Sequence, residues 1–245
     1  EDCNSYSVRT FRDAMEAIEE GAADYAVLPI ENSTAGAVNE VYDLLVEFEN
    51  YIVGEVIIPI THTLAGLPGT QLSELKRVYS KAEALMQTTR FLEEHSDWQQ
   101  ISVANTAIAA KKILDDQDRT QAAVCSAYAA KVYGLEVLED NINDESGNCT
   151  RFIIVTNQKV FLKGAKKISI CFEVPHESGS LYHLLSHFIY NDLNMSKIES
   201  RPIEGRSWEY RFFVDFEGNL EEPGVKNALR GLREESRSLK ILGNY

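Results

Sequence analysis

Residues 122–134 read Ala-Ala-Val-Cys-Ser-Ala-Tyr-Ala-Ala-Lys-Val-Tyr-Gly, a short apolar run followed by a polar residue and a helical pattern. The run Ala122–Cys125 has the length and composition of a buried strand. Ser126 stands where a helix N-cap is expected, and Gly134 follows the end of the helix. Strand, cap and helix therefore form one structural unit in this stretch.

The same unit recurs on both sides of it. Strands at Arg77–Tyr79 and Ile101–Val103 are each followed by small polar residues and then by a helical pattern. The other elements expected before residue 156 are a helix from Phe11 capped by Thr10, a strand Tyr25–Ile30, a helix from near Gly36 to Phe48, one or two strands within Tyr51–Leu64, a helix over about Ala82–Glu94, and strands Leu135–Leu138 and Arg151–Val155. Strands that alternate with helices predict an α/β fold with parallel sheets.

Small hydroxyl or amide residues stand at the strand-to-helix junctions. They are Ser33, Ser80, Asn105, Thr106 and Ser126. In open α/β sheets, ligands bind at the carboxyl ends of the strands, where helix N-termini favour anions. The chain has 38 acidic and 24 basic residues, a formal net charge of −14, so its overall field repels an anion and any attraction must be local. The junctions predict a crevice for a small anion, although each residue also has a structural explanation as a helix cap.

The order of expected strands and helices changes near Val160–Lys167. The pattern beyond it is strand Ile168–Val174, helix Ser180–Tyr190, strand Met195–Arg201, strand Trp208–Phe216, helix Glu222–Glu234 and strand Leu239–Leu242. This βαββαβ order is typical of the ferredoxin-like fold, an α+β arrangement. We place a domain boundary at about residue 163, which gives predicted domains 1–163 and 164–245.

Composition excludes several classes of protein. No apolar run approaches the roughly 20 residues that span a bilayer, and an acidic chain without a basic stripe is not typical of proteins that bind nucleic acid or anionic membranes. The four cysteines show no CxxC spacing and there are only five histidines, so we expect reduced thiols and no metal site. Neither GxGxxG nor GxxxxGK[ST] occurs, so no nucleotide cofactor is expected. No signal peptide is present, and we expect a cytoplasmic protein.

Two polar features favour structural roles. His62 lies in a strand-like run and fits a hydrogen-bonded structural histidine better than a site residue. The loop Asp140–Asn148 is rich in Asn, Asp and Glu, but its spacing does not match a calcium loop, so a solvated turn is the better interpretation.

Several segments, taken in order along the chain, resemble one family. They are Pro29-Ile30-Glu31-Asn32-Ser33-Thr34-Ala35-Gly36, the run YGLEVLEDNINDESGNCTRF at 133–152, and in the tail Gly179-Ser180-Leu181-Tyr182 and Glu199-Ser200-Arg201-Pro202. The first two resemble prephenate dehydratase, and the tail segments resemble the phenylalanine-binding motifs of the ACT domain that follows it in that family. The resemblance covers nearly the whole chain.

The resemblance implies a two-lobed catalytic domain, built like a periplasmic binding protein, with one lobe inserted at about 62–150 and an ACT domain at 164–245. It implies a lyase that converts prephenate to phenylpyruvate in phenylalanine biosynthesis, with loss of CO2 and water and without cofactor or metal. Prephenate is a small dicarboxylate with a ring hydroxyl. Such an enzyme needs a proton donor for the hydroxyl and groups that bind and orient the two carboxylates.

The resemblance also assigns residues. Thr150 would donate to the departing hydroxyl, as a hydrogen-bond donor or relay, because a threonine hydroxyl is a poor acid. Arg151 would clamp a carboxylate bidentately, with a structural salt bridge as the alternative. The expected neutral donors of the cleft are Asn32, Ser33, Ser80, Gln87, Asn105, Thr106 and Ser126. Phe152 would pack behind the site, and the roles of Glu31 and His62 stay open.

The ACT resemblance implies feedback control by L-phenylalanine. The amino acid would bind at an interface between ACT domains, in a homodimer or homotetramer. The residues expected to form that pocket are Gly179, Ser180, Leu181, Glu199, Ser200, Arg201 and Pro202.

The sequence departs from the family at two places. Family members begin with a Gly-rich strand–loop–helix segment that does not precede Glu1 here, so we expect an incomplete catalytic domain or part of a longer chain, such as one with a chorismate mutase domain in front. Ser80 is followed by Lys81 and Ala82 where the family often has His-Pro. Two other interpretations stay open: an arogenate dehydratase, and a non-catalytic amino-acid-sensing protein.

Overall fold

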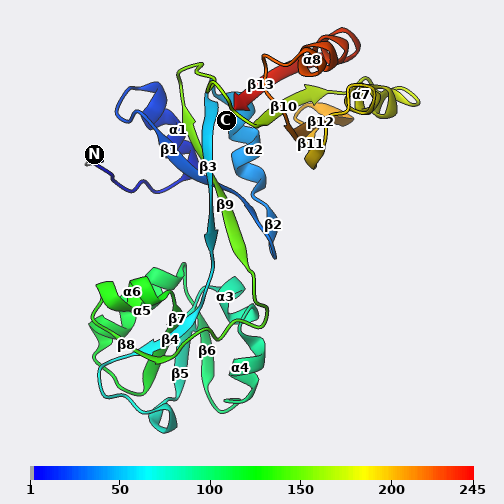
Figure 1. The fold of residues 1–245 in the computed structure, drawn as a ribbon. Helices are drawn as coiled ribbons and strands as arrows, with labels where there is room; N and C mark the ends of the chain where they lie inside the picture. Colours follow the sequence, from blue (N-terminus) through cyan, green and yellow to red (C-terminus); the bar gives the residue numbers. More distant parts are fainter. Residues whose placement is uncertain (1–2) are drawn as a thin grey trace. The chain divides into compact units, whose positions relative to one another are not determined.

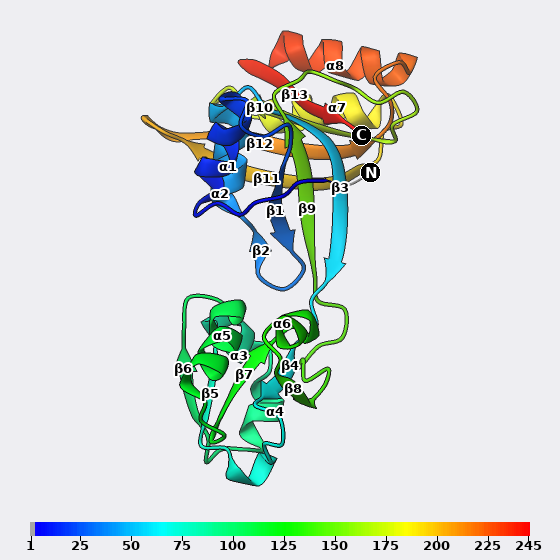
Figure 2. The same cartoon turned by 90° about the vertical axis from the view of Figure 1, so that its left-hand side faces the viewer.

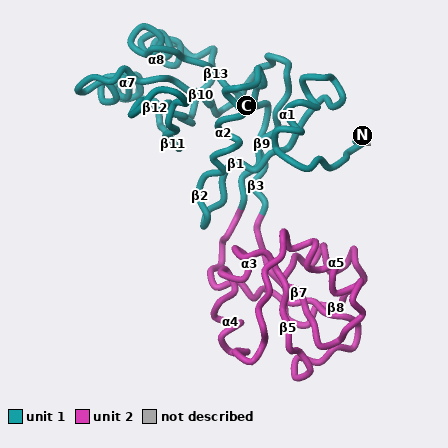
Figure 3. The backbone as a smooth tube through the Cα atoms, turned by 180° about the vertical axis from the view of Figure 1, so that it is seen from behind, with its two compact units in different colours: residues 1–58, 150–245 teal, residues 59–149 magenta. Residues whose placement is uncertain are grey.

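The computed structural model describes residues 3–245 and divides them into two compact units, coloured separately in Figure 3. Unit 1 combines the chain up to Ile58 with Thr150–Tyr245, and unit 2 is Pro59–Cys149. The inserted lobe expected at about 62–150 has nearly the same bounds as unit 2.

Unit 2 contains a mixed sheet of order β6-β5-β7-β4-β8. Its strands are β4 (Thr63–Gly66), β5 (Arg77–Ser80), β6 (Gln99–Ser102), β7 (Gln121–Cys125) and β8 (Glu136–Glu139). β5 pairs in parallel with β6 and β7, whereas β4 is antiparallel to β7 and β8. The expectation of a parallel sheet is therefore wrong at β4. A 3-10 turn, η1 (Leu72–Glu74), and loops lead from β4 to β5, without the helical crossover that joins parallel strands.

Helices cover both faces of this sheet. They are α3 (Ala82–Met86), α4 (Thr89–Glu93), α5 (Thr106–Asp116) and α6 (Ala127–Val132). Successive side chains of a strand point to opposite faces. Ala123 and Cys125 accordingly pack in the cluster beneath α5 and α6, and Ala122 and Val124 pack in the cluster beneath α3 and α4. β7 is therefore buried on both sides.

The single helix expected over Ala82–Glu94 is wrong, because the structure breaks it into α3 and α4. The hydroxyl of Thr88, at the break, donates to the carbonyl of Ala84 at 3.0 Å. The carboxylate of Asp144 accepts hydrogen bonds from the backbone N–H groups of Thr89 and Arg90, both at 2.9 Å. A carboxylate from a distant loop thus caps a new helix start.

The first part of unit 1 consists of α1 (Phe11–Glu19), β1 (Ala26–Asn32), β2 (Gly36–Ala37), α2 (Asn39–Glu47), β3 (Tyr51–Pro59) and β9 (Cys149–Thr156). Thr10 caps α1 as expected, and its partner in a reciprocal capping box is Asp13. β1 pairs with β9 in antiparallel fashion, with an irregularity between Pro29 and Glu31. β3 lies beside β9 (Figure 2). The predicted parallel pairing is therefore wrong here as well, because β9 returns from unit 2 against the direction of β1.

The remainder of unit 1 has the order β10 (Lys167–Glu173), α7 (Ser180–Ile189), β11 (Met195–Ile203), β12 (Arg206–Glu217), α8 (Pro223–Glu235) and β13 (Ser238–Asn244). This βαββαβ order is the one predicted. The strands pair in the order β11-β12-β10-β13, all antiparallel. Figure 1 shows α7 and α8 on one face of this sheet, where Leu184, Phe188 and Leu232 are buried.

The other face of that sheet packs on the first part of unit 1. Cys171 and Phe213 share a buried cluster with Leu45, and the rings of Tyr42 and Phe213 meet edge to face with centroids 4.8 Å apart. β13 also pairs with β3 in parallel at Gly243 and Ile52. A Cβ at Gly243 would lie 2.2 Å from the Ile52 carbonyl oxygen, so this close approach requires glycine. Both parts thus share one continuous sheet and one core, and the boundary at residue 163 stays a prediction.

All four cysteines are free, as expected. Burial raises the pKa of the Cys125 and Cys171 thiols to about 11, so both are neutral at physiological pH. Within residues 3–245, no helix combines the length and the apolar character that crossing a membrane requires.

Candidate functional site

Two residues expected in the site, Asn32 and Thr150, face each other across β1 and β9. The side-chain amide of Asn32 donates a hydrogen bond to the Thr150 hydroxyl oxygen at 3.0 Å. An amide nitrogen cannot accept, so the Thr150 O–H must direct its own proton elsewhere. The pair thus holds the hydroxyl with its oxygen fixed and its proton available for donation.

Asn32 also shapes the loop that follows β1. Its side-chain oxygen accepts hydrogen bonds from the backbone N–H groups of Thr34 at 3.0 Å and Ala35 at 2.8 Å, which is an Asx-turn arrangement. Ser33 is exposed in this loop. One side chain therefore fixes both the loop and the Thr150 hydroxyl. Phe152, half-buried, lies opposite Pro29 in the ladder and on the same face of β9 as Thr150.

Arg151 points to the other face of β9 and is surrounded by protein groups. Its guanidinium contacts Asp215 at 2.6 Å and Glu55 at 2.7 Å, and donates to the Tyr245 hydroxyl at 3.0 Å. Its side chain is only 12% exposed. Burial alone would lower the pKa of Arg151, but Asp215, Tyr245 and Glu55 raise it above the ordinary value. These contacts favour the structural salt bridge that was the alternative to a carboxylate clamp.

The other expected donors belong to unit 2, where β5, β6 and β7 end at one edge of the sheet. Asn105 and Ser126 are exposed N-caps of α5 and α6, and they accept hydrogen bonds from the N–H groups of Ile108 and Ala129. Thr106, the first residue of α5, is half-buried. The sequence therefore placed these residues correctly at helix starts.

Ser80 lies at the same edge, but its side chain is fully buried. Its hydroxyl donates to the backbone carbonyl of Val124 at 2.6 Å, which ties β5 to β7. This hydroxyl supports the sheet and is not a free donor on the surface.

Gln87 belongs to a polar cluster within unit 2. Its side-chain oxygen meets His62 Nε2 at 2.9 Å and accepts from the Asn148 amide at 3.0 Å. The backbone N–H of His62 in turn donates to Asn143 Oδ1 at 2.6 Å. His62 is 6% exposed and hydrogen-bonded, as a structural histidine should be. The loop at 140–148 is therefore anchored by its asparagines, and the expectation of a merely solvated turn is wrong for Asn143, Asp144 and Asn148.

A cavity of about 250 Å³ lies at the start of α7. Three predicted pocket residues line it: Gly179, Ser180 and Leu181. Gly179 has a left-handed backbone (φ +81°), which favours glycine. Trp208 and Tyr210 also line the cavity and were missed by sequence reasoning, although aromatic residues in a strand next to a predicted pocket are a usable signal. Trp208 adopts a φ of 65°, a strained conformation for a bulky residue and a common mark of a functional site.

The other predicted pocket residues do not line this cavity. They are Glu199, Ser200, Arg201 and Pro202, all on β11. Arg201 and Pro202 border a different hollow with α2, where Arg201 forms a bidentate ion pair with Asp43 at 2.7 and 3.0 Å. One copy of the chain therefore does not bring the two predicted phenylalanine-binding segments into one cavity.

The described residues contain no cluster of three or more His, Cys, Asp or Glu side chains that could hold a metal ion. Hydroxyl and amide side chains stand at the strand ends described above. Such groups suit the binding of a small polar or anionic molecule.

Comparison with known proteins gives consistent results. The family profile for prephenate dehydratase matches residues 1–160. A bifunctional chorismate mutase/prephenate dehydratase of Aquifex aeolicus is 40% identical over 96% of this chain and 65% of that protein. Arogenate dehydratase/prephenate dehydratase 6 of Arabidopsis thaliana is 36% identical over 99% of this chain and 63% of that protein. The chain thus spans a little under two thirds of the length of these relatives.

Solved structures match over almost the whole chain. Prephenate dehydratase from Arthrobacter aurescens, in complex with L-Phe, superposes with a TM-score of 0.87 at 33% identity and covers 96% of this chain and 79% of that one. A protein described as a novel type of quorum quenching acylase, GqqA, gives a TM-score of 0.87 at 32% identity over 96% of this chain and 86% of that one.

The fold defines an α/β protein with a ferredoxin-like C-terminal segment. The matches are more specific than this class. The chain belongs to the prephenate dehydratase family.

Proposed function

We propose that this chain carries prephenate dehydratase activity, a lyase reaction that converts prephenate to phenylpyruvate. The bond from the ring to its carboxylate breaks and its electron pair enters the ring. The ring hydroxyl leaves and takes up a proton, so that CO2 and water are released. Aromatisation drives the reaction, and the protein's tasks are to orient the substrate and to assist the leaving hydroxyl.

The observation that carries this proposal is the hydrogen bond from Asn32 to Thr150. It occupies the Thr150 oxygen and leaves its O–H proton for a ligand. Thr150 then donates to the departing hydroxyl of prephenate, as a hydrogen-bond donor or relay. Asn32 is a positioning residue in this scheme, because it acts through Thr150.

The carboxylates of prephenate need partners as well. We propose the neutral donors that the family resemblance implies, which are Ser33, Gln87, Asn105, Thr106 and Ser126. Ser80 is omitted because its hydroxyl is bonded inside the sheet, and Arg151 is omitted because protein carboxylates already surround it. Neutral donors suit a chain with a net charge of −14, since they attract an anion locally.

The test is phenylpyruvate formation from prephenate, followed by ultraviolet absorbance. Thr150→Ala should lower kcat about 100-fold or more, the loss typical of one transition-state hydrogen-bond donor, and Thr150→Ser should keep most of the rate. Thr120→Ala is the control, because this hydroxyl bonds Asp118 at the amino end of β7. A Thr150→Ala variant with the parent rate would contradict the role of Thr150, and a parent without turnover would contradict the activity.

Arogenate is the competing substrate, since relatives with both names match this chain almost end to end. Parallel assays with prephenate and arogenate decide between them. A third outcome, binding of prephenate by calorimetry without any product, would make the chain a sensor rather than an enzyme. The GqqA structure, described as a quorum quenching acylase, adds an acylase assay as a fourth measurement, because one fold can host different activities.

We further propose that the C-terminal segment is an ACT domain that binds L-phenylalanine. Gly179, Ser180 and Leu181 line one cavity of about 250 Å³, and Glu199–Pro202 lie apart from it on β11. This separation supports binding between two copies, one giving each segment, in a homodimer or homotetramer. Relatives whose names combine chorismate mutase with prephenate dehydratase support the further proposal of a chain accompanied by chorismate mutase activity. The cytoplasmic location stays a proposal.

A further inference from the structure

The two residues that precede and follow the Asn32–Thr150 pair are charged, and both are held by the C-terminal segment. Glu31 lies opposite Arg151 in the ladder between β1 and β9, directly next to the Asn32–Thr150 rung. Because successive side chains alternate, Glu31 and Arg151 point to the face opposite the Thr150 hydroxyl. These two side chains therefore belong to the strands that present Asn32 and Thr150.

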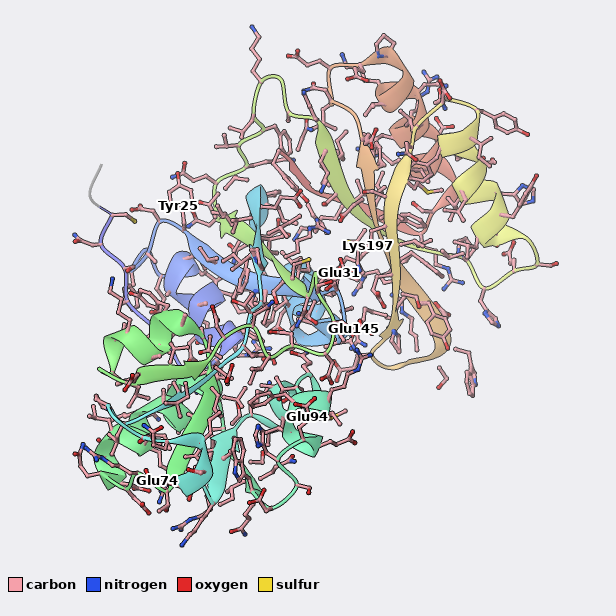
Figure 4. The ribbon with its side chains drawn as sticks, turned by 60° about the horizontal axis from the view of Figure 1, so that its bottom comes forward. Tyr25, Glu31, Glu74, Glu94, Glu145 and Lys197 are labelled. Carbon is pink, nitrogen blue, oxygen red and sulfur yellow. The ribbon has the colours of Figure 1, made fainter. Side chains whose placement is uncertain are left out.

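Glu31 is held by β11. Lys197 Nζ lies 2.6 Å from Glu31 Oε1, and the Lys197 side chain is only 14% exposed. Figure 4 shows Glu31 and Lys197 side by side, from β1 and β11 respectively. Lys197 also approaches Glu199, the first residue of the segment resembling a phenylalanine-binding motif, at 3.8 Å.

Arg151 is held by Asp215 on β12 and by Tyr245. Asp215 Oδ2 contacts its Nη1 at 2.6 Å, while the other oxygen, Oδ1, accepts from Ser169 at 2.5 Å. Ser169 in turn meets the Tyr245 hydroxyl at 2.8 Å, which also accepts from Arg151. The Arg151 network thus includes three residues after position 163, which are Ser169, Asp215 and Tyr245.

A buried network of this kind costs desolvation, so it contributes more to geometry than to net stability. Its contacts lie directly beside the Asn32–Thr150 rung of the ladder between β1 and β9. Residues 197, 199 and 201 share one face of β11, and Arg201 reaches Asp43 on α2. A ligand that displaces β11 must therefore disturb contacts to the strand pair.

We propose that Lys197 and Asp215 are positioning residues for Thr150, and that through Glu31 and Arg151 they transmit the state of the C-terminal segment to the Asn32–Thr150 pair. This inference rests on the proposed function of Thr150. The two ion pairs, Lys197–Glu31 and Asp215–Arg151, each link the two parts of unit 1 and determine the position of the Thr150 hydroxyl.

The experiment compares Lys197→Met, Lys197→Arg and Asp215→Asn with the parent, in the full chain, by phenylpyruvate formation with and without L-phenylalanine. Glu47→Gln is the matched control, because it breaks the Arg12–Glu47 pair at 2.5 Å, which lies within the first part of unit 1. Lys197→Met and Asp215→Asn should lower kcat about tenfold with KM changed less than threefold, the pattern of a loss expressed in the transition state. The effect of L-phenylalanine on the rate should be smaller in Lys197→Met and in Asp215→Asn than in the parent. Lys197→Arg should restore most of kcat and most of the response to L-phenylalanine. Glu47→Gln should behave as the parent.

A second measurement separates this inference from the proposed function. Hydrogen–deuterium exchange of the amides at 30–34 and 149–152 should quicken in Lys197→Met and Asp215→Asn and stay unchanged in Glu47→Gln. If the parent turns over no substrate, the proposed function fails and the exchange result alone decides the positioning role. If Asp215→Asn does not fold, the two Lys197 variants decide. Folded variants with the parent kcat, the parent response to L-phenylalanine and unchanged exchange would overturn the inference.

Discussion

The amide of Asn32 donates a hydrogen bond to the hydroxyl of Thr150 across 3.0 Å, although the two residues are 118 positions apart in the chain. The same Asn32 side chain holds the loop at Thr34 and Ala35 through its oxygen. One residue therefore combines a donor role toward Thr150 with an acceptor role toward the loop, and substitutions can separate the two.

Asn32→Asp removes the donor and keeps the acceptor. The Thr150 O–H would then turn to the new carboxylate, because a carboxylate only accepts, and its proton would no longer serve the substrate. We expect kcat for phenylpyruvate formation to fall about 100-fold, with little change in the melting temperature. Asn39→Asp, in the exposed first turn of α2, is the control. A rate within a factor of a few of the parent would show that the direction of this hydrogen bond does not matter.

Gln87→Met should destabilise unit 2. The thioether has nearly the length of the glutamine side chain but leaves His62 Nε2 and the Asn148 amide without this acceptor. Leaving a buried polar group unsatisfied costs about 1–3 kcal/mol, so thermal unfolding should begin several degrees lower. Gln100→Met, on an exposed position of β6, is the control. Equal melting temperatures for the two variants would argue against a structural role for the cluster.

The lowered pKa of Glu173 predicts that the folded protein loses stability in acid. Burial alone would raise the pKa of this carboxyl, but hydrogen bonds from Arg206 and Arg211 outweigh it, so its pKa lies below the ordinary value. A folded-state pKa below the unfolded one stabilises the protein above the unfolded pKa, and this contribution is lost as the pH falls through the folded pKa. The melting temperature should therefore fall between about pH 5 and pH 3, since an unperturbed glutamate titrates near 4.3.

The check is the same titration with Glu173→Gln, which cannot titrate. Its melting temperature should be lower than the parent's at pH 7 and should depend less on pH in the acid range. A variant with the full acid dependence of the parent would assign that dependence to other carboxylates, such as Glu55, whose pKa is also lowered, against its burial, by Lys167 and Arg151.

Gly179→Ala should weaken L-phenylalanine binding. Gly179 lines the cavity with φ +81°, and an added Cβ would lie 3.4 Å from His183 Nε2. A left-handed conformation costs a residue with a Cβ about 1–2 kcal/mol, so the segment at the start of α7 should shift. Calorimetric titration with L-phenylalanine should show at least tenfold weaker binding.

Gly164→Ala is the control for that strain. Gly164 has φ +79° with open space where its Cβ would stand, and it does not line the cavity. Its variant should lose comparable stability and keep the parent affinity. Equal loss of binding in both variants would mean that general destabilisation, and not the cavity, explains the effect.

Most of the helices and strands could be predicted from local pattern. Thr10, Asn105 and Ser126 cap helices as expected, because an N-cap depends on one side chain and on N–H groups two or three residues away. The βαββαβ order of the tail followed in the same way from alternating and helical periodicities. The failures lie where distant groups intervene, as when Asp144 starts a new helix at Thr89.

The same distinction between local sequence patterns and contacts with distant residues applies to the candidate site. Sequence motifs indicated Asn32, Thr150 and Arg151 as a set, and the ladder between β1 and β9 then decided what each can do. Thr150 and Arg151 are neighbours in the chain, yet pleating sends them to opposite faces. The Thr150 hydroxyl accepts from Asn32, so its own proton points elsewhere, while the Arg151 guanidinium contacts Glu55 and Asp215.

The sequence by itself determined most of the elements, the family and the identity of the polar residues at the strand ends, because propensities, caps and motifs act over a few residues. The tertiary structure alone decided which of those residues are already bonded to protein: Ser80 to Val124, Gln87 to His62 and Asn148, and Arg151 to residues of the C-terminal segment. These contacts join residues up to about a hundred positions apart. A side chain's hydrogen-bonding capacity is limited, so its remaining chemistry depends on neighbours that only the folded chain supplies.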